Sequence, residues 1–300
     1  MRIFITGATG YLGYHFTNVA VSQGHQILCL RRTSSASLFE PLVEEYIRWI
    51  NNDDPEFERK VSEFAPDVLF HAAWSGVRGT ERNDLRIQRA NIELSIRLFH
   101  IFQYKQIIAL GSQAEYGFYN GPVTEAHTLN PTMEYAKAKT TVCDALRELC
   151  ESRKIEWQWL RLFTVFGEKQ TGGLIKQFTN NCISGAQTFD TTPGEQIYSY
   201  FYTYDFACAV SKMLGTIGKS GIYNIDQIEE DHSNRELIEQ IKSMLHSNIH
   251  INYGSYPYPD NQIMYMKGDT TKYTNAFGLI QHTDFNEALA RTIESFRLCH

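Results

Sequence analysis

The sequence has no long hydrophobic run and no stretch of low complexity. A membrane-spanning helix needs about 18 or more consecutive apolar residues, and no window of the chain supplies them. The chain opens directly on the strand-like segment Arg2–Thr6, without a charged and then apolar leader. We therefore expect no membrane association and a place in the cytoplasm.

The chain also has little that would attract nucleic acid or hold a metal. Its 28 Lys and Arg stand against 34 Asp and Glu, a formal net charge of -6, so it lacks a general field for phosphate backbones. The cysteines form no Cys-x-x-Cys pair and no metal-like spacing. We expect no nucleic acid and no metal, and we interpret as buried, reduced thiols Cys29, Cys143, Cys150, Cys182, Cys208 and Cys299.

What the first half does contain is an alternation of short apolar segments with segments of helical periodicity. In a chain of 300 residues, this alternation predicts a parallel sheet covered by helices on both faces. We expect strands over residues 2–7, 26–32, 67–73, 106–112 and 157–163, and helices over residues 11–24, 55–64, 91–104 and 135–152. This order makes an α/β fold with a doubly wound, Rossmann-type sheet.

After Gly167 the rhythm changes. We expect a helix opening at Thr171, a short strand near Phe189, one aromatic strand over residues 197–205 and a strand over residues 221–226. The expected division is a Rossmann domain at residues 1–166 and, at residues 167–300, mostly a smaller α+β cap with segments that return to the Rossmann sheet.

Three glycines lie between the first strand and the first helix. Gly7, Gly10 and Gly13 are spaced three apart in GATGYLG. A tight turn that brings backbone close to a pyrophosphate, followed by a helix N-terminus with free N–H groups, needs glycine at such positions. The context therefore predicts a dinucleotide-binding turn.

The end of the second strand bears on the choice of dinucleotide. An NAD enzyme normally has an acidic residue there for the ribose 2′-hydroxyl, but this chain has Arg31 and Arg32, followed by Thr33. Two guanidinium groups suit a 2′-phosphate, so we expect NADP(H) rather than NAD.

A catalytic set follows in the next strand and helix. Ser112 stands at the end of one expected strand, and Tyr135 and Lys139 are spaced i, i+4 on one helix face. A nearby ammonium lowers the pKa of a phenol toward the working pH, which makes Tyr135 a candidate proton donor or acceptor.

These segments together resemble the extended short-chain dehydrogenase/reductase family. GATGYLG, HAAW, GSQAEYG, YAKAK and RLFTVFG occur in the family's order over essentially the whole chain. The resemblance implies that Ser112 orients a carbonyl, Tyr135 transfers its proton and Lys139 holds the nicotinamide ribose. It also implies cofactor contacts at Gly7, Thr9, Gly10, Tyr11, Leu12, Gly13, Arg31, Arg32, Ala72, Ala73, Trp74, Asn91, Tyr135 and Lys139, and substrate contacts at Trp74, Ser112, Gln113, Thr164 and Gln196.

The residues after Ser112 narrow the reaction. Nucleotide-sugar 4,6-dehydratases of this family have an acidic pair where this chain has Gln113 and Ala114. The epimerase-reductase that makes GDP-fucose has a cysteine at the place of Ala114, and the segment after Gly167 in this chain lacks a histidine matching that enzyme's second proton carrier. Dehydration and epimerisation at C3 or C5 are both disfavoured.

The second half resembles sugar-nucleotide 4-ketoreductases such as the CDP-abequose and CDP-paratose synthases. The resemblance implies NADPH-dependent reduction of the C4 keto group of a nucleotide-linked 4-keto-6-deoxy or dideoxy sugar, in the biosynthesis of deoxysugars for surface polysaccharides. It departs at Tyr198 and Ser199, where many relatives have an Arg-Asp pair whose arginine contacts the diphosphate. Candidates to replace that arginine are Lys176, Lys267 and Lys272, although each also fits an ordinary surface lysine.

Two alternatives stay open. One is an NAD(P)-dependent nucleotide-sugar 4-epimerase, and the other is a non-catalytic NADP sensor or RNA-binding relative. A homodimer through the helices at residues 91–104 and 135–152 is possible, although burial against the sheet explains their apolar residues equally well, among them Ile92, Leu94, Ile96 and Leu98.

Overall fold

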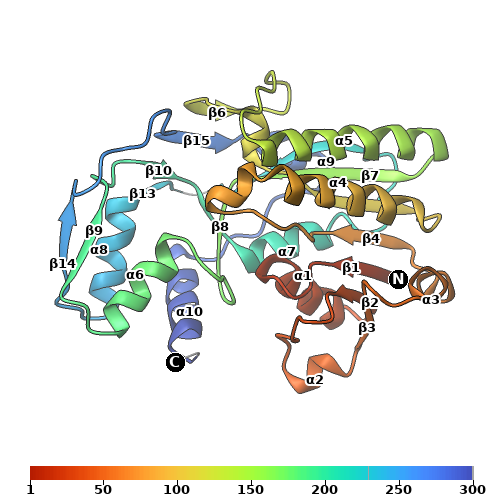
Figure 1. Ribbon diagram of the computed structural model, residues 1–300, viewed down its shortest axis with the longest axis horizontal. Coiled ribbons are helices and arrows are strands. Elements are labelled where there is room, and N and C mark those ends of the chain that lie inside the picture. The colour runs from red at the N-terminus through yellow and green to blue at the C-terminus, as the bar shows by residue number, and fades with distance from the viewer. Residues whose placement is uncertain (229, 299–300) are drawn as a thin grey trace.

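A computed structural model describes residues 1–228 and 230–298 (Figure 1). Its centre is a seven-stranded parallel sheet in the order β12-β7-β5-β4-β1-β2-β3. The strands are β1 (Arg2–Thr6), β2 (Gln26–Arg31), β3 (Ile47–Asn51), β4 (Val68–His71), β5 (Gln106–Leu110), β7 (Glu156–Leu162) and β12 (Gly221–Ile225). The chain starts in the middle of the sheet and winds outward both ways, which confirms the doubly wound Rossmann fold.

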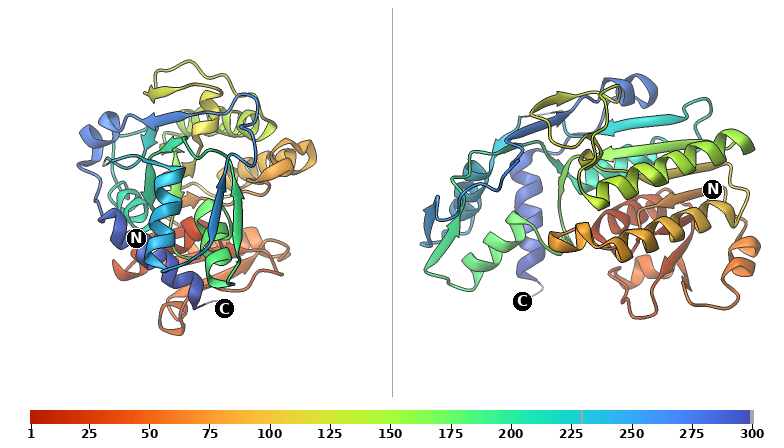
Figure 2. Two further views of the ribbon diagram at one scale, coloured as in Figure 1. Left: turned by 90° about the vertical axis from the view of Figure 1, so that its left-hand side faces the viewer. Right: turned by 45° about the horizontal axis from the view of Figure 1, so that its top comes forward.

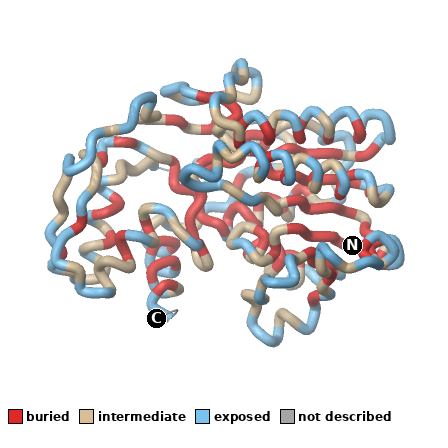
Figure 3. Tube along the Cα trace, in the orientation of Figure 1, coloured by how far each residue is buried: buried red, intermediate tan, exposed pale blue. Residues whose placement is uncertain are grey.

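Helices cover both faces of this sheet because successive strand residues point to opposite sides. Ile3 and Ile5 pack on one side with α1 (Tyr11–Ser22), α7 (Thr203–Ser211) and α9 (Thr271–Phe277), whereas Phe4 packs on the other. That other face is covered by α3 (Phe57–Phe64), α4 (Leu85–His100) and α5 (Glu134–Arg153). Figure 3 shows the buried strands between helices whose outer turns are exposed.

The second lobe has a core of its own, built from α6 (Leu174–Ile183), α8 (Asn234–Met244) and α10 (Phe285–Arg297) (Figure 2). One small sheet has the order β13-β10-β15-β6, and two strand pairs, β8 with β11 and β9 with β14, complete the lobe. These strands are β6 (Gly121–Val123), β8 (Thr164–Phe166), β9 (Thr188–Thr191), β10 (Ile197–Tyr198), β11 (Tyr200–Tyr202), β13 (His232–Ser233), β14 (His250–Tyr253) and β15 (Tyr265–Gly268). Three short helices belong to the first half of the chain and not to this lobe: α2 (Pro41–Glu44), η1 (Gly79–Asn83) and η2 (Gln113–Tyr116).

Several element boundaries differ from the sequence prediction. The helix expected over residues 91–104 begins at Leu85, because the Asp84 carboxylate accepts the backbone N–H of Arg86 and Ile87, and it ends at His100. The helix expected from residue 55 begins at Phe57. The edge strand β3 had no counterpart in the prediction.

The single aromatic strand expected over residues 197–205 was also wrong. Ile197–Tyr198 pairs with β13 and β15, Tyr200–Tyr202 pairs with β8, and Thr203 begins α7. The strand at Gly221–Ile225 lies beside β7 in the large sheet. The chain therefore passes back to the Rossmann sheet after it has entered the second lobe.

The cysteines only partly match the expectation of burial. Cys29, Cys143 and Cys150 are buried free thiols, but Cys182 and Cys208 are half-buried, because each lies on a helix flank that reaches the surface. Cys299 lies outside the described residues.

Three of the four apolar residues considered for a dimer face contact the core, and the fourth, Ile96, is half-buried. Leu98 is fully buried, and Ile92 and Leu94 pack against the core under α4. Among residues 1–228 and 230–298, no helix combines the length and the apolar character that a membrane crossing requires.

Candidate active site

The glycine turn has the tight backbone that the sequence predicts. Gly7 has φ +83°, and a Cβ on it would lie 2.7 Å from the backbone of Ala72 and of Ala73. A Cβ on Gly13 would lie 2.2 Å from the Gly7 carbonyl oxygen. Gly10 precedes α1 and has no side chain to cap it, so N–H groups of the first turn are left for a bound anion. The turn thus fits a dinucleotide pyrophosphate.

Three further residues expected to contact the cofactor lie in or directly after this turn. Thr9 belongs to the turn, and Tyr11 and Leu12 form the start of α1; all three are half-buried. Burial raises the pKa of Tyr11 to about 12, so its phenol stays protonated at neutral pH.

The carboxyl end of β2, where the adenosine ribose is expected to bind, has two arginines: Arg31 is fixed by its neighbours and Arg32 is exposed. Arg31 Nε donates to Asn51 Oδ1 at 3.2 Å, and the guanidinium lies 5.1 Å from the Trp49 ring centroid. Arg32 is exposed. Both cations therefore stand at the carboxyl end of β2, without an acidic residue in the strand itself.

The predicted catalytic residues come together at the carboxyl end of β5. Ser112 follows the strand and caps η2, and its side chain lies close enough to the phenol of Tyr135, in the first turn of α5, to lower the pKa of that phenol. Lys139 is buried one turn later; its Nζ donates to the Leu110 carbonyl at 2.6 Å and lies 3.6 Å from the Trp74 ring centroid.

The electrostatics of this set differ from the expectation of a lowered phenol pKa. The pKa of Tyr135 is raised, because burial of the phenol outweighs the opposing effects of the Ser112 side chain and the Arg82 charge. Lys139 Nζ is 5.9 Å from the Tyr135 ring centroid, and burial lowers the pKa of this ammonium to about 7. In this geometry Lys139 turns toward a carbonyl rather than toward the phenol.

A buried ion pair that the sequence prediction missed supports Ser112. Glu115 is 0% exposed, and one of its oxygens accepts the backbone N–H of Ser112 at 2.8 Å. The other oxygen accepts Arg161 Nε at 2.8 Å, and Trp159 Nε1 also donates to the carboxylate. The signal for Glu115 was present as a capping box, Ser112 followed three residues later by Glu. Arg161 has no such signal, because it sits inside an apolar strand.

A cleft of about 300 Å³ reaches Gln113, the residue after Ser112, but its lining includes none of the three catalytic residues and not Trp74. It contains the expected substrate residues Gln113 and Thr164 but neither Gln196 nor any of the three candidate lysines. Gln196 is buried and accepts from Asn234, which does line the cleft. The lining consists of Gln113, Thr164, Val165, Phe166, Gln170, Gly173, Leu174, Ile175, Tyr198, Tyr200 and Asn234.

Two of the side chains that line this cleft have buried amide oxygens. Oε1 of Gln113 and Oε1 of Gln170 are buried and have no hydrogen-bond partner. A buried acceptor without a partner is costly, and hydroxyl groups of a bound sugar would satisfy both. Gln170 was not foreseen, since nothing in the loop after β8 singles it out.

The lysines expected to replace the diphosphate arginine lie elsewhere. Lys176 lies 5.2 Å from the Phe296 ring centroid, Lys267 pairs with Asp231 at 2.9 Å, and Lys272 lies 5.0 Å from the Tyr223 ring centroid. The cleft instead includes Gly173, the uncapped N-terminus of α6.

Asn91 and Trp74 shape the loop after β4. The Asn91 amide donates to the Ser75 carbonyl at 2.8 Å and accepts the Ser75 N–H at 3.0 Å. Trp74 Nε1 donates to Gln88 Oε1 at 3.0 Å, and its ring stands edge-on to Tyr135. The side chain of Asn91 is therefore engaged in holding this loop, while Trp74 lies at the catalytic set.

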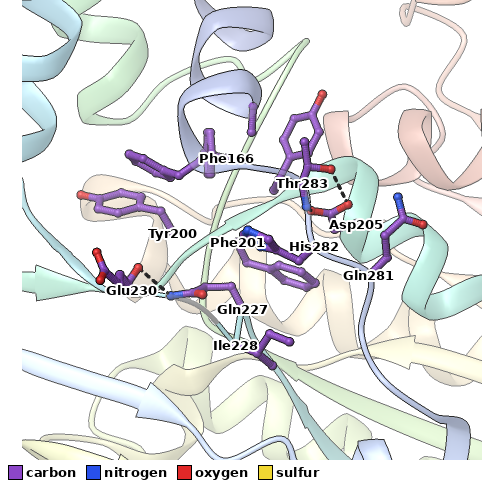
Figure 4. A pocket seen from close by; sticks show the side chains of 13 residues that line it. Phe166, Tyr200, Phe201, Asp205, Gln227, Ile228, Glu230, Gln281, His282 and Thr283 are labelled. Atoms are coloured by element: carbon purple, nitrogen blue, oxygen red, sulfur yellow. Dashed lines mark hydrogen bonds between the residues drawn. The ribbon is translucent and has the colours of Figure 1, made fainter.

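A second cavity lies between β11, α7 and the segment before α10 (Figure 4). It holds about 20 Å³, which is room for about one water molecule and not for a sugar. Asp205 closes one side by accepting both the N–H and the hydroxyl of Thr283. We therefore place the candidate site at the larger cleft.

The chain is similar to several known proteins over most of its length. CDP-abequose synthase from Salmonella muenchen is 24% identical over 91% of this chain and 90% of that protein. UDP-glucose 4-epimerase from Lactobacillus helveticus is also 24% identical, over 93% of this chain and 91% of that protein. Among solved structures, MoeE5 in complex with UDP-glucose and NAD has the same fold, with a TM-score of 0.85 and 18% identity over 100% of this chain and 99% of that one.

The family itself is settled by a match that spans most of the chain. The sequence profile of the NAD dependent epimerase/dehydratase family matches residues 3–226, which include the glycine turn, Ser112, Tyr135 and Lys139. The chain is an enzyme of the NAD dependent epimerase/dehydratase family, within the extended short-chain dehydrogenases/reductases.

Proposed function

We propose that this enzyme reduces the C4 keto group of a nucleotide-linked 4-keto-6-deoxy or dideoxy sugar with NADPH. The observation that carries the proposal is the meeting of Ser112 and Tyr135 next to Gln113, which lines a cleft whose lining includes no Asp, Glu, His or Lys. Such a site can move one proton at one carbonyl oxygen, which is what reduction requires.

The position of Glu115 supports reduction over dehydration. Elimination from a sugar needs a base and an acid in addition to the Ser/Tyr/Lys set, and Gln113 and Ala114 cannot serve. Glu115 is the nearest carboxylate in sequence, but it is fully buried and paired with Arg161. It therefore cannot reach a substrate proton.

The residues of the Rossmann half fit a dinucleotide with a 2′-phosphate. The Gly7–Gly13 turn would take the pyrophosphate, and Arg31 and Arg32 would take the 2′-phosphate. When bound, the nicotinamide supplies the hydride to the sugar carbon. Lys139 would hold the nicotinamide ribose.

The chain's own groups then handle the oxygen. Ser112 donates a hydrogen bond to the substrate carbonyl and fixes its direction. Tyr135 gives its phenolic proton to the oxygen as negative charge develops there, and its raised pKa keeps that proton in place before the reaction. Gln113 and Gln170 accept hydrogen bonds from sugar hydroxyls and orient the ring.

A nucleotide-sugar 4-epimerase is the second candidate, because the same three residues suffice for it and one curated relative is a UDP-glucose 4-epimerase. The two reactions differ in their use of cofactor. A reductase oxidises one cofactor molecule for each product, whereas an epimerase leaves the cofactor unchanged.

The test follows NADPH and NADH oxidation with CDP-, dTDP- and GDP-linked 4-keto-6-deoxy sugars made in place by dehydratases. We expect stoichiometric NADPH oxidation with one nucleotide series. In Tyr135→Phe, turnover should fall by about 100- to 10,000-fold while NADPH binding is kept. Sugar interconversion without cofactor consumption would instead establish the epimerase, and unchanged turnover in Tyr135→Phe would remove this residue from the mechanism.

The cellular setting belongs to the same proposal. We place the enzyme in the cytoplasm, where it would supply a deoxysugar for a surface polysaccharide. A homodimer through α4 and α5 would have to use polar contacts, since the outward side chains there include Arg97, Asp144 and Arg147.

A further inference from the structure

One arginine outside the predicted catalytic set lies against Tyr135. Arg82 belongs to η1, and its guanidinium carbon is 4.9 Å from the Tyr135 ring centroid. The next residue fixes this contact, because Asn83 Oδ1 accepts the backbone N–H of Glu134 at 3.1 Å. Residues 82 and 83 therefore meet residues 134 and 135 side by side, and η1 is docked on the first turn of the catalytic helix.

The charge of Arg82 is not cancelled by its surroundings. In the described ranges 1–228 and 230–298 it has no ion pair, and its Nε is buried without a hydrogen-bond partner. Two of the three nearby acids are engaged elsewhere, and the third, Glu81 in η1, forms no ion pair among the described residues. Asp84 binds Arg86, and Glu134 binds Lys137 at 2.7 Å.

Three other titratable groups lie near the Tyr135 phenol, one on each of α5, η2 and α1. Lys139 on α5 lies 5.9 Å from the ring centroid, but its ammonium donates to Leu110. Glu115 on η2 carries negative charge that opposes ionisation of the phenol, and Tyr11 on α1 faces Tyr135 as a neutral phenol. Arg82 is the cation whose charge lowers the pKa of Tyr135 against the effect of burial.

We propose that Arg82 is a positioning residue that stabilises negative charge on Tyr135 during proton transfer, whereas the ammonium of Lys139 is held by the Leu110 carbonyl. A phenolate spreads its charge into the ring, and a guanidinium against the ring attracts it more strongly than it attracts the neutral phenol. The consequence for rate rests on the proposed reaction. The electrostatic effect does not, and it can be measured without turnover.

The experiment is a pH titration by NMR of the protein labelled with ¹³Cζ-tyrosine, with Tyr135→Phe used to assign the signal. We expect the Tyr135 midpoint in Arg82→Gln to lie above that of the unchanged protein by about one pH unit or more. Arg82→Lys should restore part of the shift. The matched control is Arg86→Gln, whose side chain is 92% exposed and pairs with Asp84, and it should leave the midpoint unchanged.

Two results would overturn the proposal. One is an equal midpoint in Arg82→Gln and the unchanged protein, with circular dichroism showing that both are folded. The other is a midpoint in Arg82→Gln that lies below that of the unchanged protein, because the guanidinium would then not favour the phenolate.

The rate provides a second readout once a substrate is found. In the reducing direction Tyr135 must hold its proton, so kcat falls as pH rises through its pKa. Removal of the Arg82 charge should move that fall to higher pH by the shift seen in the NMR titration. If no sugar is turned over, the proposed reaction fails and the NMR result still decides the role of Arg82.

Discussion

Arg31 and Arg32 are neighbours in the chain but differ in what holds them. Arg31 is fixed by Asn51 and by the Trp49 ring, both on the adjacent strand β3, whereas Arg32 is exposed. A cation that is already held loses less side-chain entropy when it binds a phosphate. Arg31 is therefore the better placed of the two to select the cofactor.

Replacing both residues, Arg31→Ala with Arg32→Ala, should weaken NADPH binding by about 10- to 100-fold, because charge-assisted hydrogen bonds to the 2′-phosphate are lost. NADH binding should change much less. Titration of tryptophan fluorescence with each cofactor measures both affinities. Arg48→Ala, an exposed arginine on β3, is the control, and equal losses for both cofactors would rule out recognition of the 2′-phosphate.

At the residue scale, the sequence predicts best what is local. Tyr135 and Lys139 share a helix face, and the apolar segment before Ser112 predicts the end of a strand. Their approach to Ser112 could therefore be inferred. Arg82 could not be found, because its contact with Tyr135 depends on how η1 docks on α5. No spacing in the chain encodes that docking.

At the scale of elements, η2 is held beneath the site by the Glu115–Arg161 pair. Both side chains are essentially excluded from solvent, at 0% and 2% exposed, and Arg161 also donates to the hydroxyl of Tyr116. A buried charge that loses its partner is strongly destabilising. The same contact holds the backbone of Ser112.

Glu115→Gln should therefore lower the free energy of unfolding by about 3–5 kcal/mol, because it leaves the Arg161 guanidinium without its counter-charge. The double variant Glu115→Gln with Arg161→Met should recover part of that loss. Urea denaturation followed by circular dichroism measures both. A single variant within about 1 kcal/mol of the parent would mean that the pair contributes little to stability.

Element prediction failed where pairing partners are distant in sequence. The segment Ile197–Asp205 alternates aromatic and polar residues, which favours one strand, but its two halves find different partners and Thr203 begins a helix. The strand β3 escaped notice because it pairs only with β2 and its burial does not alternate regularly along the chain. The local pattern of apolar and polar residues predicts which face of a strand is buried, but it does not predict which strands it pairs with.

At the scale of the whole molecule, one buried carboxyl joins the large sheet to the second lobe. Asp226 follows β12, and its Oδ2 accepts the Ser199 hydroxyl at 2.7 Å and the Gly268 N–H at 2.8 Å. Ser199 separates β10 from β11, and Gly268 ends β15. Burial raises the pKa of Asp226 to about 7.

This pKa predicts a pH dependence of stability. Because the folded protein binds the Asp226 proton more tightly than the unfolded chain does, the group's contribution is fully present below about pH 4 and is lost as pH rises through about 7. Unfolding free energies measured in urea from pH 4.5 to 8 should fall more steeply in the parent than in Asp226→Asn. Asp144→Asn, at an exposed pair, is the control, and parallel curves for parent and Asp226→Asn would contradict the assignment.

The return of β12 to the large sheet has a consequence for how the chain can be divided. A fragment that stopped at Phe166 would keep the glycine turn and the catalytic helix but would lose β12 and α7. Strand β7 would then become an open edge with unpaired N–H and C=O groups, and the apolar face of α1 would lose its cover. Such a fragment would tend to self-associate. Folding of the nucleotide-binding half therefore has to wait for residues that are synthesised after the first segments of the second lobe, among them α6.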